Sequence, residues 1–209
     1  MTLNLIGLGL NEKSFSLESV SALKKCKKVY FENYTSVLNE NLNYLEKLIN
    51  KKIIEVDRNF VENYDVSEAG KNEIAFLIVG DVFSATTHIS LFNDCKKKNI
   101  EVKIFNNASI LTAVGITGLS LYNFGKVASI PFENKKIETP IKILKDNLKI
   151  NAHTLFLLDL NPGENKYLSI KDAVEYLEKK GVKEKIIGCA RLGSENFVVK
   201  YGDMKKIKN

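Results

Sequence analysis

A carboxylate and a pair of hydroxyls follow the most apolar segment of the chain. Residues 74–79 form an unbroken apolar run, and Gly80 and Asp81 come directly after it. Thr86 and Thr87 then stand where the next helix is expected to begin. Ligands bind at the carboxyl ends of the strands in open α/β sheets, so Asp81 is a candidate binding residue. On this segment alone the favoured alternative is a carboxylate that only caps a turn.

A second candidate turn lies near the start of the chain, in the sequence IGLGL at residues 6–10. Glycine allows a tight turn and lets a ligand come close to the backbone at the end of a strand. The G-x-G spacing lacks the third glycine of the dinucleotide fingerprint. A nicotinamide or flavin site is therefore not favoured here.

The composition is that of an ordinary globular protein. Of the 209 residues, 44% are hydrophobic and 27% are charged. No apolar run approaches the roughly 20 residues that a membrane-spanning helix needs. The first residues, MTLNLIGLGL, lack the charged leader and cleavage site of a signal peptide. We therefore expect a cytoplasmic protein that is not inserted in a membrane.

Cysteine and histidine are too sparse for a disulfide framework or a metal site. Cys26, Cys95 and Cys189 are far apart and odd in number, which favours reduced, buried thiols. His88 and His153 are the only histidines. Two isolated imidazoles do not form a zinc-binding pattern, so no metal is expected.

The net charge of +6 raises the question of nucleic-acid binding. The basic residues are nearly all lysines, because Arg58 and Arg191 are the only arginines. Arginine is the usual residue for bidentate contacts to phosphates and bases. We therefore expect a solvated lysine surface and no specific nucleic-acid partner.

The first half of the chain alternates between strand and helix patterns, which predicts a parallel sheet covered by helices. Ser16 is placed to cap the first helix, and a second amphipathic helix is predicted over 42–49. A third helix is expected to run from Thr86 and Thr87 to the lysines at 96–98. Within 57–72 only a short helix near 67–71 is predicted. The predicted strands are 3–8, 29–31, 53–56, 74–79 and 101–105.

The second half is also an α/β pattern, but it begins with a segment rich in small residues. Asn107 or Ser109 is the predicted cap of a helix there, and later helices are predicted from Pro140 and over 169–180. The predicted domains are residues 1–105 and 106–209, with the ligand site in the cleft between them. The predicted strands of this half are 127–131, 153–160, 186–190 and 197–201.

Several motifs, in order along the chain, resemble those of the diphthine synthases, which belong to the tetrapyrrole methylase superfamily. They cover nearly the whole chain, and their order is more specific than any one of them. The matching segments are IGLGL at 6–10, YFENYTS at 30–36, GDVFSATTH at 80–88, NASI at 107–110, AVGITGLSLYNFG at 113–125, SIPF at 129–132, HTLFLLDL at 153–160 and ARLGS at 190–194.

The resemblance implies a two-domain α/β fold of the tetrapyrrole methylase type, with a parallel-sheet N-terminal domain, a mixed-sheet C-terminal domain and the ligand cleft between them. It also implies a homodimer. The implied enzyme uses S-adenosyl-L-methionine, releases S-adenosyl-L-homocysteine and successively methylates the amino group of a modified histidine of translation elongation factor 2. That histidine carries an aminocarboxypropyl group, and the reaction belongs to diphthamide biosynthesis.

The resemblance also implies particular site residues. The carboxylate of Asp81 suits the amino or hydroxyl groups of the cofactor, and Ser109 suits its carboxylate. The loop after the second strand and His88 supply groups that orient the acceptor, but no residue is assigned as catalytic. The implied cofactor contacts are Leu10, Asp81, Ser84, Ser109, Ile110, Leu158 and Leu192, and the acceptor-side candidates are Glu32, Tyr34, Thr35 and His88.

Two departures from the family pattern bear on these expectations. Val82 stands where the family usually has proline after Gly-Asp, which predicts a slightly softer loop. The family also continues beyond the position matched by Asn209, so we expect a C-terminal domain shortened at its end, with the adenine-bordering segment lost or supplied by another chain. Two alternatives remain open: a methyltransferase of the superfamily with a corrinoid precursor or ribosomal RNA as acceptor, and a catalytically silent binding protein.

Overall fold

The computed structural model describes residues 1–209 except 12, 35, 37–41, 85–87 and 209. Contacts within the chain divide it into two compact units, Met1–Leu111 and Thr112–Asn209. The domain boundary at residues 105 and 106 stays a prediction. Within the described part of the chain, every helix is too short or too polar to cross a lipid bilayer.

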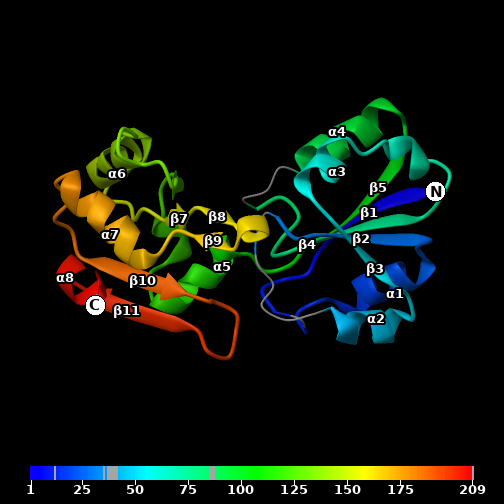
Figure 1. Cartoon of the computed structure of the whole chain (residues 1–209), viewed down its shortest axis with the longest axis horizontal. Helices are drawn as coiled ribbons and strands as arrows, with labels where there is room; N and C mark the ends of the chain where they lie inside the picture. Colours follow the sequence, from blue (N-terminus) through cyan, green and yellow to red (C-terminus); the bar gives the residue numbers. More distant parts are fainter. Residues whose placement is uncertain (12, 35, 37–41, 85–87, 209) are drawn as a thin grey trace. The chain divides into compact units, whose positions relative to one another are not determined.

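The first unit is built on a five-stranded parallel sheet in the order β3-β2-β4-β1-β5 (Figure 1). All five strands were expected from the sequence, within one or two residues at their ends. They are β1 (Thr2–Gly7), β2 (Lys28–Glu32), β3 (Ile53–Val56), β4 (Ile74–Ile78) and β5 (Glu101–Phe105).

The central strand β4 is buried on both of its faces. Ile74, Phe76 and Ile78 belong to one hydrophobic cluster, whereas Ala75 and Leu77 belong to another. All five side chains are fully buried. Alternate residues of a strand point to opposite faces of the sheet, so this continuous apolar run fills two cores at once.

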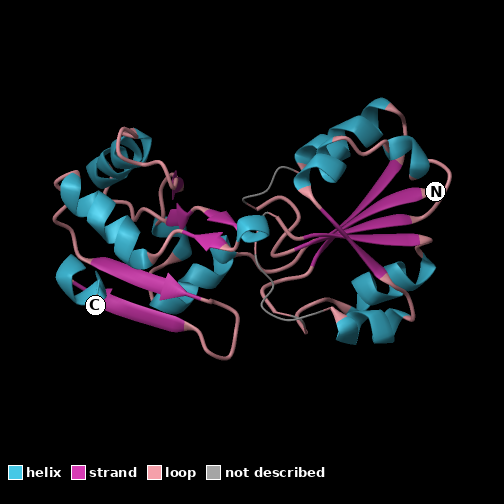
Figure 2. Ribbon diagram, viewed as in Figure 1, coloured by secondary structure: helices cyan, strands magenta, loops and turns pink. Residues whose placement is uncertain are grey.

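Helices cover both faces of this sheet, as Figure 2 shows. The hydroxyl of Ser16 accepts a hydrogen bond from the N–H of Ser19 at 3.0 Å and caps the first helix as predicted. Side chains from α1 and α2 pack in one cluster, and those from α3, η1 and α4 pack in the other. These elements are α1 (Leu17–Lys25), α2 (Asn43–Ile49), α3 (Arg58–Glu62), the 3-10 helix η1 (Val66–Glu68) and α4 (Ile89–Lys97).

The helix α3 was missed in the sequence, and the prediction of only one short helix within 57–72 was wrong. Asp57 caps α3, because its carboxylate accepts a hydrogen bond from the N–H of Phe60 at 2.8 Å. Val61 is the only buried residue of this five-residue helix. A helix that buries one side chain has no hydrophobic period to detect.

The second unit contains three two-stranded sheets, one parallel and two antiparallel, so it combines both strand directions. Its core lies among α6, α7, α8 and β6. The strands are β6 (Ala128–Ile130), β7 (Phe156–Leu158), β8 (Leu160–Asn161), β9 (Lys166–Tyr167), β10 (Ile186–Ala190) and β11 (Val198–Gly202). The helix α5 (Ile110–Ala113) spans the boundary between the two units. The helices of the second unit are η2 (Val114–Thr117), η3 (Leu121–Asn123), α6 (Thr139–Lys149), η4 (Pro162–Glu164), α7 (Ile170–Lys179) and α8 (Met204–Lys208).

The long strand predicted over 153–160 is wrong in detail, because Asp159 separates β7 from β8. The carboxylate of Asp159 accepts hydrogen bonds from the N–H groups of Phe132 at 3.2 Å and Leu160 at 3.1 Å. A side chain that bonds to nearby backbone N–H groups competes with the regular pairing of a strand. The apolar pattern alone does not reveal that competition.

The helix α8 was also missed, since its lysines were expected to form only a solvated surface. Met204 and Ile207 lie three residues apart and are both 7% exposed. Residues three apart share one face of a helix, so Met204 and Ile207 pack α8 against the core while its lysines lie on the remaining faces.

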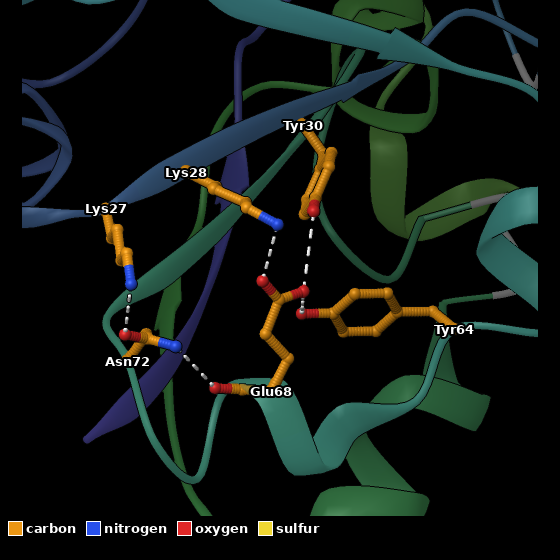
Figure 3. Close-up of polar contacts among 6 residues, drawn as sticks. All are labelled: Lys27, Lys28, Tyr30, Tyr64, Glu68 and Asn72. Carbon is orange, nitrogen blue, oxygen red and sulfur yellow. Dashed lines mark hydrogen bonds and ion pairs between the residues drawn. The ribbon is translucent and has the colours of Figure 1, made fainter.

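An ion pair and hydrogen bonds to the carboxylate of Glu68 link η1 to the start of β2 (Figure 3). Its carboxylate lies 2.7 Å from the ammonium of Lys28 and accepts hydrogen bonds from the hydroxyls of Tyr30 at 3.4 Å and Tyr64 at 3.2 Å. The hydrogen bond from Lys28 is the main cause of the lowered pKa of Glu68. Since Lys28 begins β2, this network lies at the edge of the sheet opposite the carboxyl ends of the strands.

We expect Glu68→Gln to lower the free energy of unfolding by about 1 to 2 kcal/mol at about pH 7, because charge-assisted hydrogen bonds are lost. A carboxyl whose pKa is lowered on folding stabilises the fold above its ordinary pKa and loses that effect as the pH falls through the folded pKa. The difference between the two proteins should therefore shrink below about pH 4. Urea unfolding at both pH values measures it.

The matched control is Glu62→Gln, because Glu62 lies 3.9 Å from Arg58 and both side chains are more than half exposed. Exposed pairs contribute little, so this variant should differ from the natural protein by less than about 0.5 kcal/mol. A difference for Glu68→Gln that stays constant down to about pH 3 would show that the carboxylate charge is not what matters.

Candidate functional site

The carboxyl ends of β1 and β4 are joined to each other beyond the regular sheet. The N–H of Gly9 donates to the carbonyl of Gly80 at 3.0 Å, and the N–H of Gly80 donates back to the carbonyl of Gly9 at 2.8 Å. Both glycines have positive φ values, +73° at Gly9 and +84° at Gly80. The two predicted turns, IGLGL and Gly-Asp, therefore form one continuous edge.

The glycines of IGLGL are required by close packing at this edge. A Cβ atom on Gly7 would lie 2.7 Å from the carbonyl oxygen of Gly80, and one on Gly9 would lie 2.6 Å from the Cβ of Ser14. Real Cβ atoms do not approach other atoms so closely. Only glycine fits at these positions, which supports the close backbone approach predicted from the sequence.

Asn107 binds the loop after β5 to this same edge. Its side-chain amide donates hydrogen bonds to the carbonyls of Gly7 at 3.0 Å and Ser14 at 2.9 Å. The sequence interpretation considered Asn107 only as a helix cap. Its position directly after a strand was the available signal, because that is where the loops of a parallel sheet meet.

Asp81 connects the loops that follow β4 and β5. One carboxylate oxygen accepts hydrogen bonds from the N–H of Phe83 at 3.2 Å and the hydroxyl of Ser84 at 3.0 Å. The other accepts one from the N–H of Asn107 at 3.1 Å. A carboxylate offers about four acceptor positions, so these bonds to described residues leave room for a further donor. Asp81 thus caps a turn and remains partly exposed to solvent.

The Gly-Asp-Val departure from the family pattern has a structural counterpart. Val82 is fully buried and belongs to the core cluster on one face of the sheet. Its side chain anchors the loop by packing, at the position where proline would restrict φ. Asp81 keeps its place beside Asn107 with valine at this position.

Ser109 and Ile110 lie next to Gly80 at the start of α5. Ser109 is 3% exposed, and its hydroxyl accepts a hydrogen bond from the N–H of Leu111 at 3.2 Å. A Cβ atom on Gly80 would lie 3.8 Å from Ser109, which is ordinary contact distance. The first unit therefore brings Leu10, Asp81, Ser84, Ser109 and Ile110 to one edge, while their role as cofactor contacts stays a prediction.

Leu158 and Leu192 belong to the second unit. Leu158 ends β7 and is half-buried. Leu192 is 8% exposed and lies between two residues with positive φ, Arg191 at +53° and Gly193 at +90°. The role of both residues as cofactor contacts stays a prediction, based on the motifs at 153–160 and 190–194.

The acceptor-side candidates differ in their exposure. Glu32 is fully buried at the end of β2, and Tyr34 is half-buried two residues later. The ring of Tyr34 lies 6.3 Å from the ring of His88, centroid to centroid. Thr35 lies outside the described residues, as do Thr86 and Thr87 at the predicted helix start.

His88 is held as a neutral imidazole at the beginning of α4. It is fully buried, and burial lowers its pKa to about 4. Neither ring nitrogen forms a hydrogen bond to the rest of the described chain. A neutral histidine packed against Tyr34 suits a group that positions the loops after β2 and β4, two neighbouring strands.

Arg58 was not singled out in the sequence as a site residue, yet it lies at this edge. It is the first residue of α3, two residues after the end of β3, and its guanidinium carbon lies 5.3 Å from the centroid of the Tyr34 ring. The loops after β3, β2, β4, β1 and β5 therefore all supply residues at the carboxyl end of the sheet. The scarcity of arginine in the chain was the signal that could have identified it.

Comparison with known proteins agrees with this arrangement. The profile of the family Tetrapyrrole (Corrin/Porphyrin) Methylases matches residues 2–208, nearly the whole chain. The chain belongs to the tetrapyrrole methylase family. The family, the α/β fold class and the methyltransferase class predicted from the sequence are thereby confirmed.

Within the tetrapyrrole methylase family, relatives that match nearly the whole of this chain are named as diphthine synthases. The diphthine synthase of Methanocaldococcus jannaschii is 40% identical over 98% of this chain and 87% of its own length. The diphthine methyl ester synthase of Saccharomyces cerevisiae is 37% identical over 99% of this chain and 79% of its own length. A crystal structure of diphthine synthase superposes with a TM-score of 0.91 at 33% identity, covering 100% of this chain and 84% of that one.

Proposed function

We propose that this chain is a diphthine synthase. It successively methylates the amino group of the aminocarboxypropyl-histidine of translation elongation factor 2, in diphthamide biosynthesis, with S-adenosyl-L-methionine as the methyl donor. The observation that carries the proposal is the glycine-lined edge formed by Gly9, Gly80, Asp81 and Asn107, in a chain with full-length relatives named as diphthine synthases. We further propose a cytoplasmic homodimer.

The residues at this edge fit the donor chemically. The paired backbone of Gly9 and Gly80 lets a ligand approach closely, and Asp81 retains an acceptor position for an amino or hydroxyl group. When bound, S-adenosyl-L-methionine supplies a methyl group whose bond to sulfur breaks as a bond to the acceptor nitrogen forms, while the electron pair stays on sulfur and the nitrogen releases a proton. Leu10, Ser84, Ser109, Ile110, Leu158 and Leu192 complete the proposed set of contacts.

The contribution of the protein to such a reaction is alignment and exclusion of water. Holding donor and acceptor in line can supply roughly 7–11 kcal/mol of the barrier reduction in favourable cases. Buried, neutral His88 and the adjacent Tyr34 position the acceptor side, and no residue of the chain is required as a general base if the amine arrives unprotonated. Glu32 and Thr35 remain acceptor-side candidates from the sequence.

The test is methylation of archaeal or eukaryotic elongation factor 2 that carries the aminocarboxypropyl-histidine, with radiolabelled S-adenosyl-L-methionine. We expect label on the modified histidine, and none on elongation factor that lacks the modification. Mass spectrometry before and after mild alkali counts the methyl groups and separates N-methyl groups from a methyl ester. Label on a corrinoid precursor or ribosomal RNA instead would assign another acceptor, and binding of the factor without transfer would indicate a silent binding protein.

A further inference from the structure

The chain contains an arginine at the carboxyl edge of the first unit that no motif assigned to the reaction. Arg58 lies two residues after the end of β3, and Tyr34 lies two residues after the end of the neighbouring strand β2. The last residues of these strands, Val56 and Glu32, pair with each other. The guanidinium of Arg58 therefore reaches the ring of Tyr34, 5.3 Å away. Arginine over an aromatic face is a favourable and oriented arrangement.

The guanidinium lies over the ring of Tyr34, but its N–H donors are not used by the described neighbours. It donates no hydrogen bond to any described side chain or carbonyl, and among the described residues the one carboxylate within 4 Å of it, on Glu62, lies 3.9 Å from Nε. The side chain is 64% exposed. A guanidinium has five N–H donors in a planar fork that matches a carboxylate, so it is available for a bidentate partner.

The aromatic contacts continue from Arg58 toward the proposed donor site. The ring of Tyr34 lies 6.3 Å from that of His88, which is seven residues after Asp81 in the sequence. By ordinary strand spacing, β3 and β4 are about 10 Å apart, and β3 and β1 are about 14 Å apart. Arg58 thus follows β3, the Gly9–Gly80 edge follows β1 and β4, and Tyr34 follows β2, the strand between β3 and β4.

We infer that Arg58, held over the ring of Tyr34, binds the carboxylate of the aminocarboxypropyl group on the acceptor. This inference rests on the proposed function. The acceptor carries its amine and its carboxylate on the same carbon atom, so a carboxylate fixed at Arg58 also fixes the amine. Bidentate pairing directs the amine toward the donor, since reacting atoms must lie within about 3 to 3.5 Å of each other.

The methionine tail of the donor carries the same amino-carboxylate chemistry, so the experiment separates two sources of carboxylate. The donor dissociation constant is measured by calorimetry with S-adenosyl-L-methionine. The acceptor KM is measured with elongation factor 2 that carries the aminocarboxypropyl-histidine. The full chain is used throughout, as natural protein, Arg58→Ala, Arg58→Lys and Lys52→Ala.

We expect Arg58→Ala to raise the acceptor KM about 10- to 100-fold, since charged hydrogen bonds of roughly 1.5–3 kcal/mol are lost. Arg58→Lys should recover only part of this, because lysine keeps the charge but not the fork. The dissociation constant for S-adenosyl-L-methionine should change less than about twofold in both, since the proposed donor contacts lie on other loops.

The matched control removes a positive charge from the other end of the same strand. Lys52 precedes β3, is 89% exposed and pairs with Glu46 at 2.9 Å. Lys52→Ala should leave both constants unchanged. An equal rise of the acceptor KM in Lys52→Ala and Arg58→Ala would reduce the effect to general charge attraction and overturn the inference.

Other outcomes also overturn the inference. An unchanged acceptor KM in folded Arg58→Ala removes Arg58 from acceptor binding, and a weakened donor affinity with unchanged acceptor KM assigns it to the methionine tail. Weakening of both, with a lowered unfolding temperature, would mark a structural role. If the natural protein itself binds S-adenosyl-L-methionine but methylates no factor, the proposed function fails, which is a distinct result from these.

Discussion

Alanine at Gly9 is expected to weaken binding of S-adenosyl-L-methionine at least about tenfold and to lower the free energy of unfolding by about 3 kcal/mol. The φ of +73° at Gly9 is strained for any residue with a Cβ atom. The added atom would also lie 2.6 Å from the Cβ of Ser14 and 2.9 Å from the side-chain oxygen of Asn107. Displacing the side chain of Asn107 breaks its hydrogen bonds to the carbonyls of Gly7 and Ser14, so the effect spreads over the whole edge.

The control for Gly9→Ala is Gly181→Ala. Gly181 has a φ of +79°, and a Cβ atom there would meet no atom of the described residues within 4 Å. This variant carries the backbone strain alone and should be less stable by about 1 kcal/mol, with unchanged affinity for the donor. Calorimetry and urea unfolding measure both quantities. Equal losses in the two variants would mean that close packing at Gly9 contributes nothing.

Alanine at Asn147 is expected to destabilise the second unit by about 3 kcal/mol. Asn147 is 4% exposed and acts as a substitute strand partner for Lys126. Its amide donates to the carbonyl of Lys126 at 2.8 Å and to the hydroxyl of Thr154 at 2.9 Å, and its oxygen accepts from the N–H of Lys126 at 3.0 Å. Removing the side chain leaves these groups without their partner.

A second variant, at Gly125, tests the same contact. A Cβ atom on Gly125 would clash with the side-chain oxygen of Asn147. Gly125→Ala should therefore expel the amide and cost about as much as Asn147→Ala. Once Asn147 is alanine the space is free, so the double variant should be little worse than either single one. That pattern is a coupling energy of about 2 kcal/mol or more in a double-mutant cycle. Additive losses, measured by urea unfolding, would contradict the contact.

Patterns that extend over a whole element were predictable from the sequence. The five strands of the first unit were predicted because buried parallel strands are continuous apolar runs, and α7 was predicted from its cap at Ser169 and its stop at Gly181. The motif order was sufficient to predict the family. These features depend on residue type and spacing alone.

Short elements and individual contacts were not predictable in this way. The helices α3 and α8 bury one and two side chains, which is too little to form a period, and the break at Asp159 depends on Phe132, which is distant in sequence. Single hydrogen bonds between segments leave no trace in local composition.

The sequence by itself determined that Gly9, Gly80 and Asp81 stand at the ends of buried strands, because apolar runs and glycines specify where strands begin and end. Only the tertiary structure decided that Asn107 joins these turns and that Arg58 lies over Tyr34. Strand order is the reason: β1 pairs with β4 and β5, and β2 pairs with β3 and β4, so residues about a hundred positions apart become neighbours once the sheet has formed.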